Sequence, residues 1–565
     1  MATPAAATRP APGACLLVLV LVAACGAGNG GAPGGDVSLD AAMSSPASGG
    51  KGGAAHGDAG LGGQGGAAPQ GGAGGQGGAG GQGGAAQPPP QDGPSDTSPP
   101  PPVDGPPAMT PAPDDEPLPA CKRPVAVGGS AELATAIAGA QPGDCITLAD
   151  GTYTFPTITA KGTAAAPIVI SAANVLKAVV TTGDLKLQGA AFVVVQGIMW
   201  SGSGTIWMTD TDHGRISRFR IQRMETGPQQ AFHDLAWITV FGTSSHCRVD
   251  HNDFGPQNQH GNMILVTGTE TPPLVMAQHT RIDHNHFHDV HFGGGNGWET
   301  IRSGADTYSF TSAFTLIEHN LFKKDANDPE VISIKSSDNF VRNNTLRASV
   351  GQFVLRHGNR NELSGNYILG DGEPKAMGLR VNGGQHRIFN NYVEGVSAPG
   401  IWLEGGNSND TGGIIQDHKQ VYKTDVVFNT VVNAGGISVG GSHPLDPVDC
   451  NVAYNIVQGP GGLYTMTAGS TRITFAGNIA NLGTPAVKTG VMTVDPKLMK
   501  VGEVFTIGAG SPAINAGMPT FSYVADDVEG RPRKDATPDI GANELSPEPA
   551  KLAPLTEAGV GPMAP

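Results

Sequence analysis

Residues 328–358, DPEVISIKSSDNFVRNNTLRASVGQFVLRHG, contain two short β-prone runs, VISI and QFVL, on either side of an asparagine-rich turn. The phrase NNTL in this turn has counterparts along the chain, each with an asparagine before or between apolar residues. These asparagines are Asn252, Asn285, Asn320, Asn344, Asn366, Asn391, Asn429, Asn455 and Asn478. The successive gaps are 33, 35, 24, 22, 25, 38, 26 and 23 residues. Repeats of this length, without helical periodicity, predict a solenoid of stacked β-coils.

We expect the repeated asparagines to be structural. Asparagine tolerates left-handed backbone angles at bends, and identical side chains on stacked coils can form a hydrogen-bonded ladder. Each coil would then contain three short strands separated by bends. The prediction is an all-β chain folded as a parallel β-helix.

The asparagine corner provides a register for comparing positions on different coils. Counted from the preceding repeat asparagine, Asn296, Asp328, Glu330 and Arg356 lie 11, 8, 10 and 12 residues along. These side chains should therefore converge on one lateral face, within roughly 10 Å across three coils. Lys335 follows Glu330 by five residues, which places it on the opposite face of a straight strand, so a bend must turn it back.

The first 118 residues are not expected to fold. Residues 1–25 contain the apolar run LLVLVLVAA and end at Cys25, which resembles a bacterial lipoprotein signal with Cys25 as the lipidated first residue. The alternative is a plain secretory signal with a chance cysteine. Residues 26–118 are rich in Gly, Ala, Gln and Pro, so we expect a disordered tether to a secreted or outer-membrane protein.

The net charge argues against a nucleic-acid partner. The chain carries −15 at pH 7, of which −7 falls in residues 1–118 and −8 in the remainder. A polyanion must therefore be held by local cations rather than by a basic field.

A cap is expected before the first coil. Leu133 and Ile137 have helical spacing, and a helix there would cover the otherwise exposed strand edges. The β-helix domain is predicted to span residues 119–544. Residues 545–565, rich in Pro, Ala and Gly, are predicted to be a disordered tail.

Four cysteines lie beyond the signal segment. Cys121 and Cys145 flank the cap region and are plausible disulfide partners in an oxidising compartment. Cys247 and Cys450 lie too far apart in the repeat count to pair, and we expect buried free thiols.

Several motifs resemble polysaccharide lyase family six, which includes chondroitinase B and alginate lyases. They are NGWETIR (296–302), the acids Asp328 and Glu330, ISIKS (332–336), NNT (343–345) and LRHG (355–358). The resemblance implies a right-handed parallel β-helix that uses Ca²⁺. It also implies a role for each of the following residues: calcium ligands Asn296, Asp328 and Glu330, base Lys335, acid Arg356, and substrate-binding His357. Asp328 departs from the family, where the first acid is usually glutamate.

Other residues are candidates for contact with substrate carboxylates. Arg302, Arg380, His386 and Arg387 occupy motif-like positions and could bind by charge-assisted pairing. The segment HNHFHDVHF (284–292) could indicate zinc, but its spacing is also expected of a coil that lines a polar groove.

The chemistry explains the residue types. Elimination from a 4-linked uronate removes the C5 proton, which the neighbouring carboxylate makes weakly acidic, so a cation must neutralise that carboxylate. We expect alginate as the substrate, with dermatan or chondroitin sulfate next. Two alternatives stay open: a β-helix glycoside hydrolase, which would use paired carboxylates, and a non-catalytic carbohydrate-binding or adhesive surface protein.

Overall fold

The structure is a computed structural model that describes residues 105, 121–223, 236–258, 261–269, 271–291, 297–326, 328–409, 417–534 and 536–565. The signal-like segment with Cys25 and the tether, apart from residue 105, lie outside the described residues, as does the predicted calcium ligand Asn296. In the described ranges, no helix is long and apolar enough to cross a membrane.

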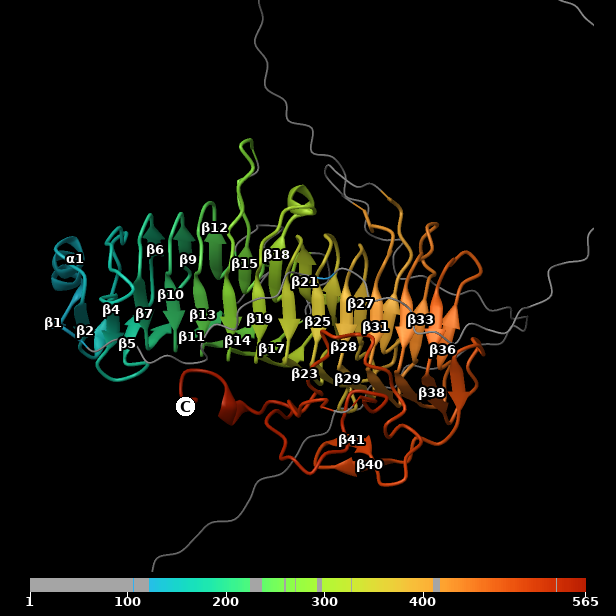
Figure 1. Ribbon diagram of the computed structural model, residues 1–565. Coiled ribbons are helices and arrows are strands. Elements are labelled where there is room, and N and C mark those ends of the chain that lie inside the picture. Colours follow the sequence, from blue (N-terminus) through green and yellow to red (C-terminus); the bar gives the residue numbers. More distant parts are fainter. Residues whose placement is uncertain are drawn as a thin grey trace, which may run out of the picture. The chain divides into compact units, whose positions relative to one another are not determined.

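The described chain forms three parallel sheets that wind into a right-handed parallel β-helix (Figure 1). Each coil from β4 to β36 contributes one strand to each sheet, so sheet neighbours are far apart in sequence. Sheet A contains β1 (Arg123–Val127), β2 (Asp144–Leu148), β4 (Ile168–Ala172), β7 (Val193–Gln196), β10 (Arg215–Ser217), β13 (Arg248–Asp250), β16 (Arg281–Asp283), β19 (Leu316–Glu318), β22 (Phe340–Arg342), β25 (Glu362–Ser364), β28 (Arg387–Phe389), β31 (Asp425–Val427), β34 (Asn451–Ala453) and β37 (Thr474–Ala476).

Sheet B follows sheet A around each coil. Its strands are β3 (Gly151–Thr152), β5 (Ala178–Val180), β8 (Ile198–Trp200), β11 (Arg220–Arg223), β14 (Asp253–Gln257), β17 (His286–Val290), β20 (Leu321–Asp325), β23 (Thr345–Arg347), β26 (Tyr367–Leu369), β29 (Tyr392–Glu394), β32 (Thr430–Val432), β35 (Ile456–Gln458), β38 (Asn478–Asn481) and β39 (Val491–Thr493).

Sheet C completes each coil and carries the candidate site. Its strands are β6 (Leu185–Gln188), β9 (Ile206–Thr209), β12 (Ile238–Phe241), β15 (Ile264–Val266), β18 (Ile301–Gly304), β21 (Glu330–Lys335), β24 (Gln352–Leu355), β27 (Leu379–Val381), β30 (Ile401–Leu403), β33 (Ile437–Val439) and β36 (Tyr464–Met466). The remaining elements are α1 (Ser130–Ala138), η1 (Asp306–Tyr308), the antiparallel pair β40 (Leu498–Val501) and β41 (Val504–Ile507), and η2 (Glu557–Gly559).

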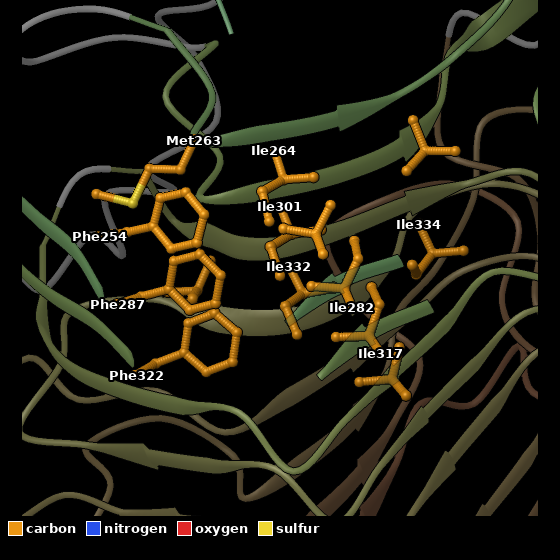
Figure 2. Packing of buried hydrophobic residues seen from close by; sticks show 14 of the residues in the cluster. Phe254, Met263, Ile264, Ile282, Phe287, Ile301, Ile317, Phe322, Ile332 and Ile334 are labelled. Atoms are coloured by element: carbon orange, nitrogen blue, oxygen red, sulfur yellow. The ribbon is translucent and has the colours of Figure 1, made fainter. Parts of the chain in front are cut away.

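The core is built from columns of like side chains. Phe254, Phe287 and Phe322 stack on successive strands of sheet B, with ring centroids 4.8 Å apart (Figure 2). Ile301 and Ile332 pair on sheet C in the same way and are fully buried. Because the coils stack in register, apolar residues need to recur only once per coil to form a continuous core.

The nine repeat asparagines form one buried ladder, as the sequence predicts. Each side-chain amide donates to the Oδ1 of the next asparagine, from Asn252 to Asn285 (2.9 Å) through to Asn455 and Asn478 (3.0 Å). The left-handed angles, however, belong to the residue before each asparagine, such as His251 with φ 53°. The asparagine is therefore selected for its hydrogen bonds and not for its backbone.

Both predicted features of the N-terminal end are confirmed. Leu133 and Ile137 of α1 are buried against the first coils, and a disulfide joins Cys121 and Cys145. Cys247 and Cys450 are buried free thiols, and burial raises the pKa of each to about 12.

The predicted disordered tail is wrong. Residues 545–565 run back along sheet B (Figure 1), where Lys323 pairs with Glu557 at 2.6 Å and Arg218 donates to the carbonyl of Ala564 at 2.8 Å. The tail is held by partners from the coils, which its own composition does not reveal.

Candidate active site

A β-bulge in β21 places the predicted charged residues on one face. Glu330 pairs with Gln352 of β24, and Ile332 pairs with the next residue of β24, Phe353. Val331 is therefore an extra residue in the strand. Val331 and Ile332 both enter the core. The extra residue reverses the alternation of side chains between the two faces of the strand. Glu330 and Lys335 therefore both lie on the outer side of sheet C, and the bulge supplies the bend that their spacing requires.

Three carboxylates meet at this face: Glu299, Asp328 and Glu330. Asp328 is buried and accepts hydrogen bonds from the backbone amides of Glu330 (3.0 Å) and Trp298 (3.3 Å). The carboxylate of Glu330 accepts from Ser333 Oγ at 2.5 Å. We refer to Glu299, Asp328 and Glu330 as the carboxylate cluster.

The three acids of this cluster differ in pKa, because burial and neighbouring charges act on each of them differently. Burial, followed by the charges of Glu299 and Glu330, raises the pKa of Asp328 to about 8. Burial also opposes ionisation of Glu330, but Arg380, Arg356 and Lys335 together lower its pKa to about 2. Burial similarly opposes ionisation of Glu299, yet Lys335 and Arg302 lower its pKa. The neighbouring cations thus act on Glu299 and Glu330, whereas burial and the charges of the other two acids dominate at Asp328. The donor atoms of the cluster are all oxygen.

The cations of the site come from three adjacent coils. Lys335 Nζ lies 3.2 Å from Glu299 Oε1, and Arg356 Nε lies 3.4 Å from Glu330 Oε1. Arg380, from β27, also pairs with Glu330. Asp328, Glu330, Lys335 and Arg356 thus converge as predicted, whereas Asn296 lies outside the described residues.

Arg302 and His357 border the same cluster. Arg302 lies on β18, in register with Ser333 of β21. His357 is buried, with Nδ1 3.3 Å from Ser309 Oγ and 3.6 Å from Asp306. Burial, then the charges of Arg356 and Lys335, holds the pKa of His357 well below its usual value. Its imidazole is therefore neutral beside Arg356.

The prediction that His386 contacts substrate is wrong. His386 is fully buried, its Nδ1 accepts from the Asn361 amide at 3.0 Å, and its Nε2 lies 3.0 Å from the Asn382 carbonyl. A second, shorter ladder runs here, in which the Asn339 amides donate to Asn361 Oδ1, and His386 Nδ1 takes the place of the next asparagine oxygen. Arg387 is also displaced from the site, because it belongs to β28 of sheet A and lies over the ring of Tyr523 at 4.2 Å.

Four polar residues at this face were not identified from the sequence: Glu299, Glu404, His418 and His443. Glu299 lies within the motif NGWETIR, in which the sequence predicted roles only for Asn296, as a calcium ligand, and for Arg302, as a contact of substrate. Glu404 Oε2 is 3.8 Å from Arg380 Nε, and the two histidines lie beyond it. The 38-residue gap after Asn391 signals the insertion that carries His418.

The site thus combines buried acids with paired cations on adjacent coils of one sheet of a parallel β-helix. A sequence model of the chondroitinase B family matches residues 127–455. The chain therefore belongs to the chondroitinase B family, within polysaccharide lyase family six.

Solved structures of the same family resemble this chain. The family six alginate lyase AlyGC is 26% identical with a TM-score of 0.62, and the match covers 78% of this chain and 60% of AlyGC. A mannuronic acid specific family six lyase from human gut microbiota is 23% identical (TM-score 0.58, 67% of this chain, 92% of that chain). Pedsa3628 from Pseudopedobacter saltans is 20% identical (TM-score 0.56, 78% and 99%).

The lower two identities show a shared fold alone. The chain spans about 60% of the length of AlyGC. No curated protein matches it.

Proposed function

We propose that this family six protein is a calcium-assisted lyase that cleaves a uronate-containing acidic polysaccharide by β-elimination. The observation that carries the proposal is the placement of Lys335 and Arg356. Lys335 is the last residue of β21, and Arg356 directly follows β24 on the next coil. Lys335 contacts Glu299, and Arg356 contacts Glu330, so each contacts a different acid of the carboxylate cluster. A base and a cation beside a buried acid cluster are the groups that this elimination requires.

The carboxylate cluster fits a calcium ion. Its donors are hard oxygens, which calcium prefers. Burial, and then the charges of Glu299 and Glu330, raise the pKa of Asp328 and favour its protonated form. A bound divalent ion would offset both effects. Asp328 and Glu330, with Asn296 as predicted, would hold it, and Glu299 is the additional acid that the geometry offers. When bound, the ion would neutralise the substrate carboxylate and so acidify the C5 proton.

The protein side chains would perform the proton transfers. Neutral Lys335 accepts the C5 proton, the C4–C5 bond becomes a double bond, and the C4–O4 bond breaks with its electrons on O4. Arg356 stabilises the charge on the departing O4, which takes a proton from solvent, and Lys335 returns the C5 proton to solvent. Lys335 can accept the C5 proton only as the neutral amine, so its ammonium proton must first leave for solvent and its ion pair with Glu299 at 3.2 Å must break.

The proposed substrate is alginate, with dermatan or chondroitin sulfate as the second candidate. In the described part of the chain, Arg302 Nε and Arg356 Nη1 are buried without a hydrogen-bond partner. Buried donors of this kind are satisfied by a bound carboxylate. Hollows on the same sheet, lined by Trp207 at one end and Trp402 at the other, extend the face beyond the charged centre. The alginate lyase AlyGC, at 26% identity, supports a polyuronate.

We also propose that the protein is secreted or held on the outer membrane through lipid on Cys25. Radiolabelled fatty acid should label the wild-type chain, and C25S should abolish labelling and release the protein. Equal labelling of both would contradict the anchor.

The test of the activity is ultraviolet detection of unsaturated uronate ends. The full-length chain is incubated with alginate, mannuronate blocks, guluronate blocks or dermatan sulfate, each with calcium or with EDTA. We expect a calcium-dependent signal on alginate. No signal on any polymer from a folded protein would reject the proposed function, and an undiminished signal in EDTA would reject the role of calcium.

A further inference from the structure

Glu404, His418 and His443 form a second polar cluster at the same face, which we call the histidine cluster. Glu404 directly follows β30, and its side chain is 1% exposed. His418 and His443 are 14% and 12% exposed, with their rings stacked 4.1 Å apart. One ligand atom from each residue lies within 4.8 Å of the other two.

The contacts inside the histidine cluster are too long for hydrogen bonds. Glu404 Oε2 is 3.7 Å from His418 Nε2, and Glu404 Oε1 is 3.6 Å from His443 Nε2. Among the described residues, Glu404 Oε2 and His443 Nε2 are buried without a hydrogen-bond partner. Buried polar atoms are almost always satisfied. These two unsatisfied atoms lie beside the imidazole of His418, an arrangement that suits ligands around an ion.

The backbone around the cluster is held in place. Ser442 Oγ donates to Glu404 Oε1 at 2.7 Å, which fixes the carboxylate from outside. The amide of Gly405 donates to the Gly441 carbonyl at 3.0 Å, and the Asn407 amide donates to the backbone carbonyl of His418 at 2.7 Å. Such outer contacts orient ligands before an ion binds.

Two other groups of acids and histidines lack this arrangement. Asp253 already bonds His286 at 3.1 Å and His288 at 3.2 Å, and its second oxygen pairs with Arg220. The histidine nitrogens that face Asp253, His286 Nδ1 and His288 Nε2, are therefore already bonded to it. The group around Asp212 is largely exposed and belongs to a stack of histidine rings on successive coils.

The geometry points to a binding site for a divalent transition-metal ion of the zinc class, formed by Glu404, His418 and His443. Two imidazole nitrogens and one carboxylate are the donors that such ions take, with one position left open. Calcium requires oxygen ligands and should not compete. The site is thus chemically distinct from the carboxylate cluster, although Arg380 contacts both Glu404 and Glu330.

The experiment is a calorimetric titration of metal-stripped, untagged full-length protein with Zn²⁺ in excess calcium. We expect one zinc ion per chain. The variants H443Q and H418Q should weaken binding at least about 100-fold, because each removes one of three ligands. The matched control H288Q, in the group around Asp253, should bind as the wild type does. Absence of binding, or loss in H288Q with retention in H443Q, would overturn the inference.

A second measurement needs no variant and so does not depend on variant folding. X-ray absorption at the zinc edge of the wild-type complex should show two imidazoles and oxygen. A shell of oxygen alone would overturn the inference. Both readouts are independent of polysaccharide cleavage, so their failure is distinct from failure of the proposed lyase activity.

Discussion

Replacing Lys335 by alanine should lower turnover at least about 100-fold while the protein stays folded and binds polysaccharide. Lys335 is the one lysine beside the carboxylate cluster among the described residues, and its side chain is 14% exposed. General-base catalysis contributes about 10²- to 10⁴-fold to a rate, or roughly 3 to 5 kcal/mol of barrier. We expect kcat to fall by that factor and KM to change little.

The same substitution has a smaller effect on stability. It leaves the Glu299 carboxylate, 1% exposed, without its lysine. Breaking a buried ion pair costs about 3 to 5 kcal/mol when the remaining charge is left alone. Asn262 still donates to Glu299 at 3.0 Å, and Arg302 still acts on it. We therefore expect a loss of about 2 kcal/mol in the free energy of unfolding.

The assay compares initial rates of unsaturated-end formation on alginate with binding measured by affinity electrophoresis. The matched control is K323A, which removes a lysine of sheet B that pairs with exposed Glu557. This control should retain the wild-type rate. If K335A kept more than about a tenth of the rate, Lys335 would not be the base. If the wild type bound alginate but showed no turnover, the adhesive alternative would gain.

Three further predictions concern the rest of the structure. Asn366→Ala should lower the free energy of unfolding by about 3 kcal/mol, because Asn366 makes four buried hydrogen bonds in the ladder; an unchanged denaturation midpoint would contradict this. In EDTA, stability should fall as pH rises through about 8, because the pKa of Asp328 is raised to about 8 on folding, so the folded protein holds this proton more tightly than the unfolded chain. Thermal unfolding of D328N should lack that slope, and an equal slope would exclude Asp328 as its cause. Deleting residues 555–565 should cost about 1 to 2 kcal/mol through lost bonds to Arg218 and Lys323, and urea unfolding with an unaltered midpoint would refute it.

The repeating part of the fold was predictable because its signal is local. Each ladder asparagine sits in a short phrase that recurs once per coil, and all nine occupy one corner. The same register predicted that Lys335 needs a bend after Glu330, which the bulge at Val331 supplies. Because side chains alternate along a strand, counting the five residues from Glu330 to Lys335 is enough to predict such a bend.

The remainder depends on contacts that counting does not reveal. His386 has the sequence context of a site residue but takes the role of a ladder asparagine, because its ring accepts from the Asn361 amide. His418 lies in the insertion that follows Glu404, where offsets from Asn391 lose their meaning. The tail is ordered by Arg218 and other coil residues, which are hundreds of positions away in sequence.

The most direct test of the central claim is mass spectrometry of alginate fragments produced in water enriched with ¹⁸O. β-Elimination breaks the C4–O4 bond without adding water, so we predict unsaturated fragments that carry no label. Hydrolysis adds one water at each cut. Saturated fragments with one ¹⁸O per cut would contradict the lyase account and favour a glycoside hydrolase on the same fold.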